Sequence, residues 1–247
     1  MLRKLLAVGA VALLPTIADA EERFVPAFEL KGPQTAKGVV VWSHGLSAYM
    51  QPDTSQGAAP EYVTMLHDSG WDIIRYNRPS GAASDFWGNS KRLAKEADDL
   101  RAQGYHAVVL AGQSAGALIS LMAAGRTRNA YAVIALAPAC CGVDRQSWQF
   151  TRNFGMVSGA VADIERSRVL IAFWRNDPYD PEGRGTDAEK TLSKHNVPHL
   201  VLDHPVGTDG HRWGNGKFFV QRFGACVLRI MSDDAMPSAA ECDGRAG

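Results

Sequence analysis

Short apolar runs alternate regularly with longer amphipathic stretches along this sequence. The first run, GVVVWS at residues 38–43, is rich in β-branched side chains and lacks polar alternation, as expected for a strand buried on both faces of a sheet. Strands that alternate with helices require right-handed crossovers and a mainly parallel sheet. The sequence therefore predicts a doubly wound α/β fold with helices on both faces, and strands at residues 38–43, 71–76, 105–111, 131–137, 168–174 and 199–202.

The amphipathic stretches between these runs predict the helices. Ser90 can cap a helix that ends before Gly104, because apolar residues recur on one face between them. Residues 138–167 lack a strong strand signal and are expected to form a small cap over the functional site. Residues 21–247 are expected to form a single domain that ends in a flexible polar tail at 233–247. The other helices are predicted at residues 61–69, 115–124, 187–195 and 216–230.

The first twenty residues differ from the rest of the chain. Arg3 and Lys4 precede an apolar run at residues 5–14, which is shorter than the about 20 residues needed to cross a bilayer. The sequence ADA at residues 18–20 has the small-x-small pattern of a signal-peptidase site. We therefore predict a signal peptide at 1–20 and a secreted or periplasmic protein, with a buried N-terminal helix as the alternative. No later stretch indicates a membrane anchor.

The composition narrows the range of partners. Lys plus Arg and Asp plus Glu each number 26, so no overall charge attracts nucleic acid, an anionic membrane or an acidic ligand. Hydrophobic residues make up 46% of the chain, which is enough for a sizeable core. A small neutral molecule is therefore the favoured partner, and the oligomeric state stays open.

The predicted export allows the four cysteines to form disulfides, because oxidising compartments permit these bonds. Four cysteines allow three full pairings. A bridge between Cys226 and Cys242, which would tie the last predicted helix to the tail, is favoured. Cys140 and Cys141 are adjacent, so a bond between them would close a strained ring, and free, partly buried thiols are the alternative. The spacing does not indicate a zinc site.

The strongest functional signal is Gly112-Gln113-Ser114-Ala115-Gly116, which fits the pattern G-x-S-x-G. It follows a predicted strand and opens a predicted helix, the setting in which this pattern forms a tight turn that lifts the serine hydroxyl clear of the backbone. The free N–H groups and dipole at the start of the helix can stabilise a developing oxyanion. Ser114 is therefore the candidate nucleophile, and a glycine-rich turn without chemistry is the alternative.

With this turn, the chain resembles the α/β-hydrolase superfamily from Gly38 to about Ile230. The resemblance rests on GQSAG at residues 112–116, on SHGL at residues 43–46 and on the order of the later elements. Within the superfamily the chain is most similar to compact esterases and to dienelactone-hydrolase-like members. It departs from dienelactone hydrolases at the nucleophile, where they have Cys and this chain has Ser114.

The resemblance implies that an acidic residue and then a histidine follow the nucleophile along the chain. His211, in a glycine-flanked loop before the last predicted helix, takes the place of the base, with His204 as the alternative. Asp177, just after a predicted strand, takes the place of the acid, with Asp180 as the alternative. A carboxylate there can accept a hydrogen bond from the histidine and stabilise the imidazolium.

Two backbone N–H groups are expected to form an oxyanion hole. Ala115, which follows the nucleophile, supplies one, and the resemblance assigns the other to Leu46, with Ser47 as the alternative. His44 is expected to shape this loop rather than to act as a base. Candidate pocket residues, each with ordinary packing or surface exposure as the alternative, are Tyr49, Met50, Asp85, Phe86, Trp87, Trp148 and Phe150.

These residues together predict hydrolysis of a small carboxylic ester through an acyl-enzyme. The mechanism needs no metal and no organic cofactor, and a neighbouring thiol, Cys140 or Cys141, has no part in it. Amide, peptide or thioester cleavage could use the same three residues. A hydrolase-like binding module without catalysis is the non-enzymatic alternative.

Overall fold

The computed structural model of the protein describes residues 23–46, 58–78, 84–144, 146–180, 182–232 and 234–243. The predicted signal peptide at 1–20 lies outside these ranges, as do Ser47, Tyr49 and Met50. Within the described ranges, no helix combines the length and the apolar character that a bilayer span requires.

One seven-stranded sheet forms the centre of the molecule, with the strand order β1-β3-β2-β4-β5-β6-β7. Every neighbouring pair is parallel except β1 with β3, which is antiparallel and closes one edge. The predicted, mainly parallel α/β sheet is therefore confirmed. The strands are β1 (Phe24–Pro26), β2 (Val39–Ser43), β3 (Asp72–Tyr76), β4 (Val108–Gln113), β5 (Ala130–Leu136), β6 (Arg168–Phe173) and β7 (His199–Asp203).

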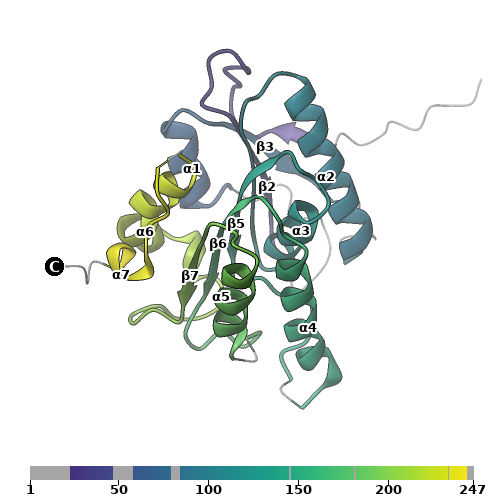
Figure 1. Ribbon diagram of the computed structural model, residues 1–247, viewed down its shortest axis with the longest axis vertical. Helices are drawn as coiled ribbons and strands as arrows, with labels where there is room; N and C mark the ends of the chain where they lie inside the picture. Colours follow the sequence, from purple (N-terminus) through teal and green to yellow (C-terminus); the bar gives the residue numbers. More distant parts are fainter. Residues whose placement is uncertain are drawn as a thin grey trace, which may run out of the picture.

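Helices cover both faces of this sheet in two groups (Figure 1). The helices α2, α3, α4 and α5 pack on one face, whereas α1, α6 and the short α7 pack on the other. Their bounds are α1 (Glu61–Asp68), α2 (Phe86–Ala102), α3 (Ala115–Ala124), α4 (Trp148–Ala162), α5 (Arg184–Lys194), α6 (Lys217–Ile230) and α7 (Ala239–Cys242), with a 3-10 turn η2 (Trp213–Asn215) before α6.

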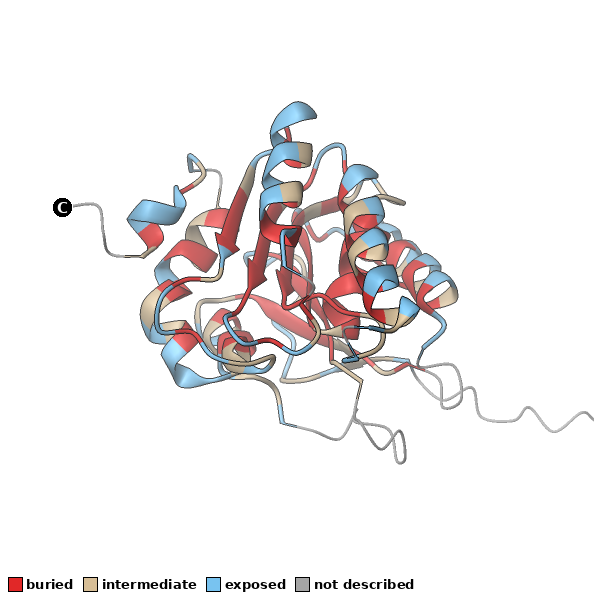
Figure 2. Cartoon of the chain, turned by 90° about the horizontal axis from the view of Figure 1, so that it is seen from below, coloured by how far each residue is buried: buried red, intermediate tan, exposed pale blue. Residues whose placement is uncertain are grey.

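The two groups of helices explain why the first strand is apolar throughout. Successive side chains of a strand point to opposite faces of a sheet. Val39 and Val41 of β2 therefore lie in the core with α2 to α5, and Val40 and Trp42 lie in the core with α1 and α6. Figure 2 shows the strands buried along most of their length between helices that are exposed only on their outer sides.

The direction of winding reverses at β2. From β2 the chain adds β3 at one edge, then returns to add β4 at the other edge, and β5, β6 and β7 continue outward from there. The loops that follow β2 and β4 therefore leave the carboxyl edge of the sheet in opposite directions. Doubly wound sheets place their functional groups at this position. Ser114 follows β4 directly, and His44 follows β2.

Several elements differ from the prediction. Helix α2 begins at Phe86, and its N-cap is Asp85, whose side chain accepts a hydrogen bond from the Gly88 N–H, so the prediction of Ser90 as the cap is wrong. The edge strand β1 and helix α4 are absent from the prediction. Helix α4 lies within residues 138–167 and packs against α3 and α5, and a cap role for this segment stays a prediction. The segment 233–247, which is expected to be a flexible tail, contains the short helix α7.

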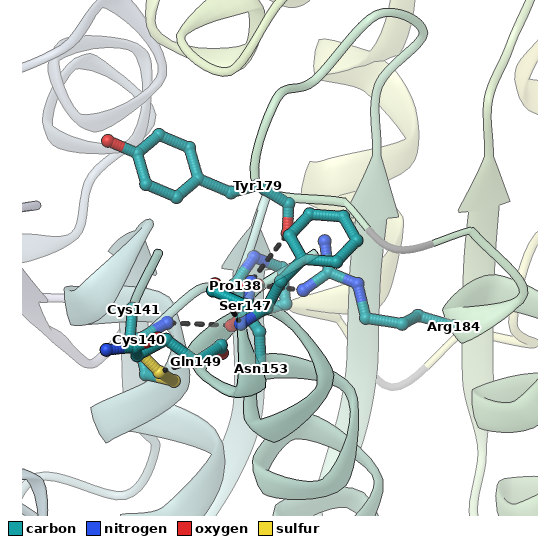
Figure 3. Close-up of a disulfide and its surroundings, with 9 residues drawn as sticks. Pro138, Cys140, Cys141, Ser147, Gln149, Asn153, Tyr179 and Arg184 are labelled. Carbon is teal, nitrogen blue, oxygen red and sulfur yellow. Dashed lines mark hydrogen bonds between the residues drawn. A yellow bond between two sulfur atoms is a disulfide. The ribbon is translucent and has the colours of Figure 1, made fainter. Parts of the chain in front are cut away.

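Both pairs of cysteines form disulfides. The predicted bridge between Cys226 and Cys242 is confirmed, and it joins α6 to α7. Cys140 and Cys141 are bonded to each other, so the alternative of free thiols is wrong. Their loop follows β5 and lies beside the start of α4 (Figure 3). Disulfides are typical of proteins from oxidising compartments.

Candidate active site

Ser114 occupies the sharp turn between β4 and α3. Its backbone has φ 57° and ψ −123°, a conformation that is rare for a residue with a side chain. Such conformations cost on the order of 1–3 kcal/mol and concentrate at functional sites. The Ser114 N–H donates to the Leu136 carbonyl at 3.0 Å, and the Ser114 carbonyl accepts from the N–H groups of Leu118 and Ala139. The turn is therefore fixed by backbone on both sides.

Gly112 and Gly116 make this turn possible. A Cβ atom on Gly112 would lie 2.4 Å from the carbonyl carbon of Gly116, and one on Gly116 would lie 2.0 Å from the carbonyl oxygen of Ser43. Atoms that are not bonded to each other do not approach so closely, so neither position has room for a side chain. The spacing G-x-S-x-G therefore follows from the close passage of β4, α3 and the loop after β2.

His211 lies beside the serine, although 97 residues separate them in the chain. Its Nε2 atom is 2.7 Å from the Ser114 hydroxyl oxygen. Its Nδ1 atom is 2.8 Å from one carboxylate oxygen of Asp177 and 2.9 Å from the other. Because a carboxylate accepts hydrogen bonds, this places the proton on Nδ1 and leaves Nε2 free to accept the serine proton.

Asp177 is held in place by its own turn after β6. Its side chain is fully buried, and one of its oxygens also accepts a hydrogen bond from the Tyr179 N–H at 2.8 Å. The ring of Tyr179 lies against the His211 ring, with a centroid separation of 4.4 Å. The turn therefore orients the carboxylate and also covers one side of the imidazole.

Further hydrogen bonds join the loops that carry these three side chains. The Gln113 side chain donates to the His211 carbonyl at 3.0 Å, which links the serine turn to the histidine loop. The Asn176 side chain donates to Asp209 at 2.7 Å, which links the aspartate turn to the same loop. Three segments far apart in the sequence are therefore braced against one another at the carboxyl edge of the sheet.

The two alternative residues lie in a separate cluster. The His204 Nε2 atom is 2.9 Å from Asp180, and Asp180 also accepts a hydrogen bond from the Arg184 side chain at 2.9 Å. Arg184 and Asp180 are almost completely buried, and Arg184 donates to the Pro138 carbonyl as well. Burial lowers the pKa of Arg184, and the attraction of Asp180 and Asp177 opposes this shift. Asp180 therefore forms a buried ion pair with Arg184, and His204 lies beside this pair rather than beside Ser114.

Leu46 and Ala115, the predicted oxyanion donors, belong to the loop after β2 and to the start of α3. Ala115 is the first residue of α3, and the first N–H groups of a helix have no partner within it. Leu46 packs against the core that contains Ala115. A Cβ atom on Gly45 would lie 3.2 Å from the Cβ of Ser114, so the loop after β2 passes directly beside the candidate nucleophile.

The candidate pocket residues that the structure describes divide between core and surface. Phe86 and Phe150 are buried within helices α2 and α4, which favours their packing role. Trp87 and Trp148 are 59% and 65% exposed at the starts of the same helices. Asp85 caps α2.

Two buried polar residues at this edge are missing from the sequence prediction. Arg78 follows β3 and donates to the loop that carries Leu46. Asn153 of α4 accepts a hydrogen bond from the Cys140 N–H and donates one to the Tyr179 carbonyl (Figure 3). Neither residue belongs to a motif. The position of Arg78 just beyond a predicted strand is the only signal that could have drawn attention to it.

The arrangement can transfer a proton from the serine hydroxyl to His211 while Asp177 stabilises the resulting positive charge. The dipole of α3 favours negative charge close to Ser114. Across the part of the chain that the structure describes, no three His, Cys, Asp or Glu side chains come together as a metal site requires.

No family model matches this sequence, and no curated protein matches it either. Its structure is nevertheless similar to many solved structures. An esterase of Pyrococcus furiosus superposes with a TM-score of 0.59 at 11% identity, over 81% of this chain and 82% of the esterase. A proposed dienelactone hydrolase of Klebsiella pneumoniae gives 0.58 at 13% identity, over 83% and 90% of the two chains. Dipeptidyl peptidase 4 of Porphyromonas gingivalis gives 0.57 at 15% identity, over 79% of this chain but 31% of the peptidase.

Proposed function

The chain has the α/β-hydrolase fold, and on that premise we propose that it is a serine hydrolase that cleaves small carboxylic esters. The observation that carries the proposal is the line of contacts from Ser114 to His211 at 2.7 Å and from His211 to Asp177 at 2.8 Å. A serine hydroxyl needs such a base to become a nucleophile, and the base needs such a carboxylate to keep the correct tautomer.

In the proposed reaction, His211 removes the proton from Ser114 as its oxygen attacks the ester carbonyl. The carbonyl oxygen becomes an oxyanion that accepts hydrogen bonds from the N–H groups of Leu46 and Ala115. His211 then donates the proton to the leaving alcohol, and an acyl-enzyme remains. Water repeats the sequence, releasing the carboxylic acid and restoring the free serine. These steps are complete without a cofactor.

The proposal extends to where the protein acts. The sequence of residues 1–20 has the pattern of a signal peptide with cleavage after Ala20, and two disulfides are consistent with an oxidising compartment. We therefore propose a secreted or periplasmic enzyme. N-terminal sequencing of the protein recovered from its native host would give Glu21 as the first residue.

The decisive experiment combines covalent labelling with a panel of substrates. A fluorophosphonate probe should label the wild type, and short p-nitrophenyl esters should be hydrolysed faster than matched anilides or thioesters. Replacing Ser114 by Ala should abolish both labelling and turnover, lowering kcat by on the order of 10⁶-fold. Ser120→Ala is the matched control, because Ser120 is a buried serine of the following helix, six residues further along.

The outcomes separate the candidate functions. A wild type that is labelled by the probe but prefers amides or thioesters would support Ser114 as the nucleophile and would change the proposed substrate class. A wild type that neither reacts with the probe nor hydrolyses any substrate would indicate a binding module instead.

A further inference from the structure

Arg78 carries a charged group into the interior at the carboxyl edge of the sheet. It follows β3 by two residues, and only 2% of its surface is exposed. Burying a guanidinium is costly unless its N–H groups find acceptors. The acceptors here come from the last residue of β2 and the loop that follows it, at residues 43–45.

Each of these contacts has a good hydrogen-bond length. The Nη1 atom of Arg78 donates to the His44 carbonyl at 2.6 Å and to the Ser43 hydroxyl at 3.1 Å. Its Nη2 atom donates to the Gly45 carbonyl at 2.8 Å and lies 3.0 Å from the Nδ1 atom of His44. The Ser43 hydroxyl and the carbonyls of His44 and Gly45 are neutral acceptors, whereas the Nδ1 atom of His44 also lies 2.7 Å from the Gly45 carbonyl. A planar guanidinium can bind several neighbouring carbonyls at once, which the single ammonium group of lysine cannot do with the same geometry.

The bond to the Gly45 carbonyl also determines the direction of the next N–H group. In a trans peptide the carbonyl of one residue and the N–H of the next point in opposite directions. Because the Gly45 carbonyl points at Arg78, the Leu46 N–H points away from it. The nucleophile turn adjoins the same glycine, since a Cβ atom on Gly45 would lie 2.7 Å from the Gln113 side-chain oxygen and 3.2 Å from the Cβ of Ser114.

We propose that Arg78 is a positioning residue that holds the Gly45–Leu46 peptide so that its N–H faces the oxyanion formed at Ser114. This inference rests on the proposed function, because it assigns a task within the same site. Arg78 does not touch the reacting atoms. It acts by fixing the orientation of a backbone donor before the reaction begins, and donors fixed in advance are the ones that stabilise a transition state most.

The test uses the full chain with Arg78→Met and Arg78→Lys variants. Arg168→Met is the matched control, because Arg168 also donates to backbone carbonyls, at 2.8 Å to Ile230 and 2.6 Å to Asp234, but lies at the first residue of β6. Steady-state kinetics with p-nitrophenyl butyrate would be normalised to the fraction of protein labelled by a fluorophosphonate. Benzeneboronic acid, which forms a tetrahedral adduct with serine hydrolases, would serve as the transition-state mimic.

Loss of one oxyanion donor lowers kcat by about 10²- to 10³-fold in serine hydrolases, and we expect a loss of that order for Arg78→Met. The KM should change by less than about threefold, because ground-state binding does not use the oxyanion. Affinity for the boronic acid should fall in parallel with kcat/KM. Arg78→Lys should recover part of the activity, and it carries the test if the Met variant does not fold. Arg168→Met should retain wild-type kcat.

A merely structural role would give a different pattern. If the Arg78 variants unfold at lower temperature but keep wild-type kcat and boronate affinity per labelled site, the proposal is overturned while the proposed function stands. If the wild type neither labels nor hydrolyses esters, the proposed function fails and this inference fails with it.

Discussion

At the scale of single residues, the structure separates two aspartates that lie three positions apart. Asp177 contacts His211, whereas Asp180 contacts Arg184 and His204. Both are buried, so burial alone does not distinguish them. The difference lies in which partner each carboxylate faces, and it leads to opposite expectations for the same substitution.

We predict that Asp177→Asn lowers kcat by on the order of 10⁴-fold and leaves the protein folded, because an amide would hold His211 in the wrong tautomer. Asp180→Asn should instead destabilise the protein by about 3 kcal/mol, because it leaves the buried Arg184 without its charged partner. Urea unfolding and ester hydrolysis of both variants, with activity normalised to folded protein, would measure the two effects.

The reverse pattern would contradict this assignment. An Asp180→Asn protein that folds as well as the wild type but is inactive would make Asp180 the functional acid. An Asp177→Asn protein with unchanged kcat would remove Asp177 from the mechanism.

Sequence reasoning places some site residues and misses others for a physical reason. The pattern around Ser114 is local, because Gly112 and Gly116 must be small wherever a strand and a helix meet so closely. Arg78 contacts Gly45, which lies 33 residues away in the chain. Asn153 contacts Tyr179 and Cys140, which lie 26 and 13 residues away. No local pattern encodes such a contact, so these residues become visible only once the chain is folded.

At the scale of elements, α4 connects two of the loops that form the site. Asn153 is completely buried, and its amide joins the loop of the Cys140–Cys141 disulfide to the backbone of Tyr179. Tyr179 donates to Asp177 through its N–H and covers His211 with its ring. The position of α4 is therefore coupled to the orientation of Asp177 and His211.

We predict that Asn153→Ala lowers stability by about 1–3 kcal/mol, because it leaves the partly buried Cys140 N–H and Tyr179 carbonyl without their partner. It should also lower kcat, since the Tyr179 backbone loses its support. Asn129→Ala is the control, because the Asn129 amide binds Asp98 at the surface, next to the start of β5. Thermal unfolding and p-nitrophenyl ester kinetics of both variants provide the comparison. Equal effects of the two substitutions would argue against any coupling of α4 to the site.

The elements that sequence reasoning predicts are those with a strong periodic pattern. The strand β2 and the helix α3 are found because one is apolar throughout and the other consists of small and apolar residues after the serine turn. Helix α4 is missed because Gly155 and Gly159 weaken its helical pattern, although Ser147 caps it. Strand β1 is missed because its three residues are half exposed and obtain their conformation from pairing with β3.

At the scale of the whole molecule, the alternation of strands and helices predicts the layers of the fold but not the order of strands. That order determines the site. Because β4 pairs with β2 rather than with β3, the loop at Gly45 lies next to Ser114. Because β6 lies two strands from β4, the turn after it brings Asp177 within reach of a histidine that follows β7. Pairing between distant strands depends on the packing of the complete sheet, which local patterns do not specify.

The two disulfides should contribute unequally to the stability of the whole molecule. A disulfide stabilises chiefly by restricting the unfolded chain, and the restriction grows with the length of the loop that it closes. Cys226–Cys242 spans 16 residues, whereas Cys140–Cys141 joins neighbours.

We predict that replacing Cys226 and Cys242 by Ala costs about 3 kcal/mol of stability, or roughly 10 °C in Tm, and that the same change at Cys140 and Cys141 costs much less. Thermal unfolding followed by circular dichroism would measure both. The Cys226/Cys242 variant should keep its ester hydrolysis at 25 °C, because this disulfide joins α6 to α7, whereas the three proposed catalytic side chains follow β4, β6 and β7. Equal losses of stability in the two variants would show that chain restriction is not the main contribution of the bridge between α6 and α7.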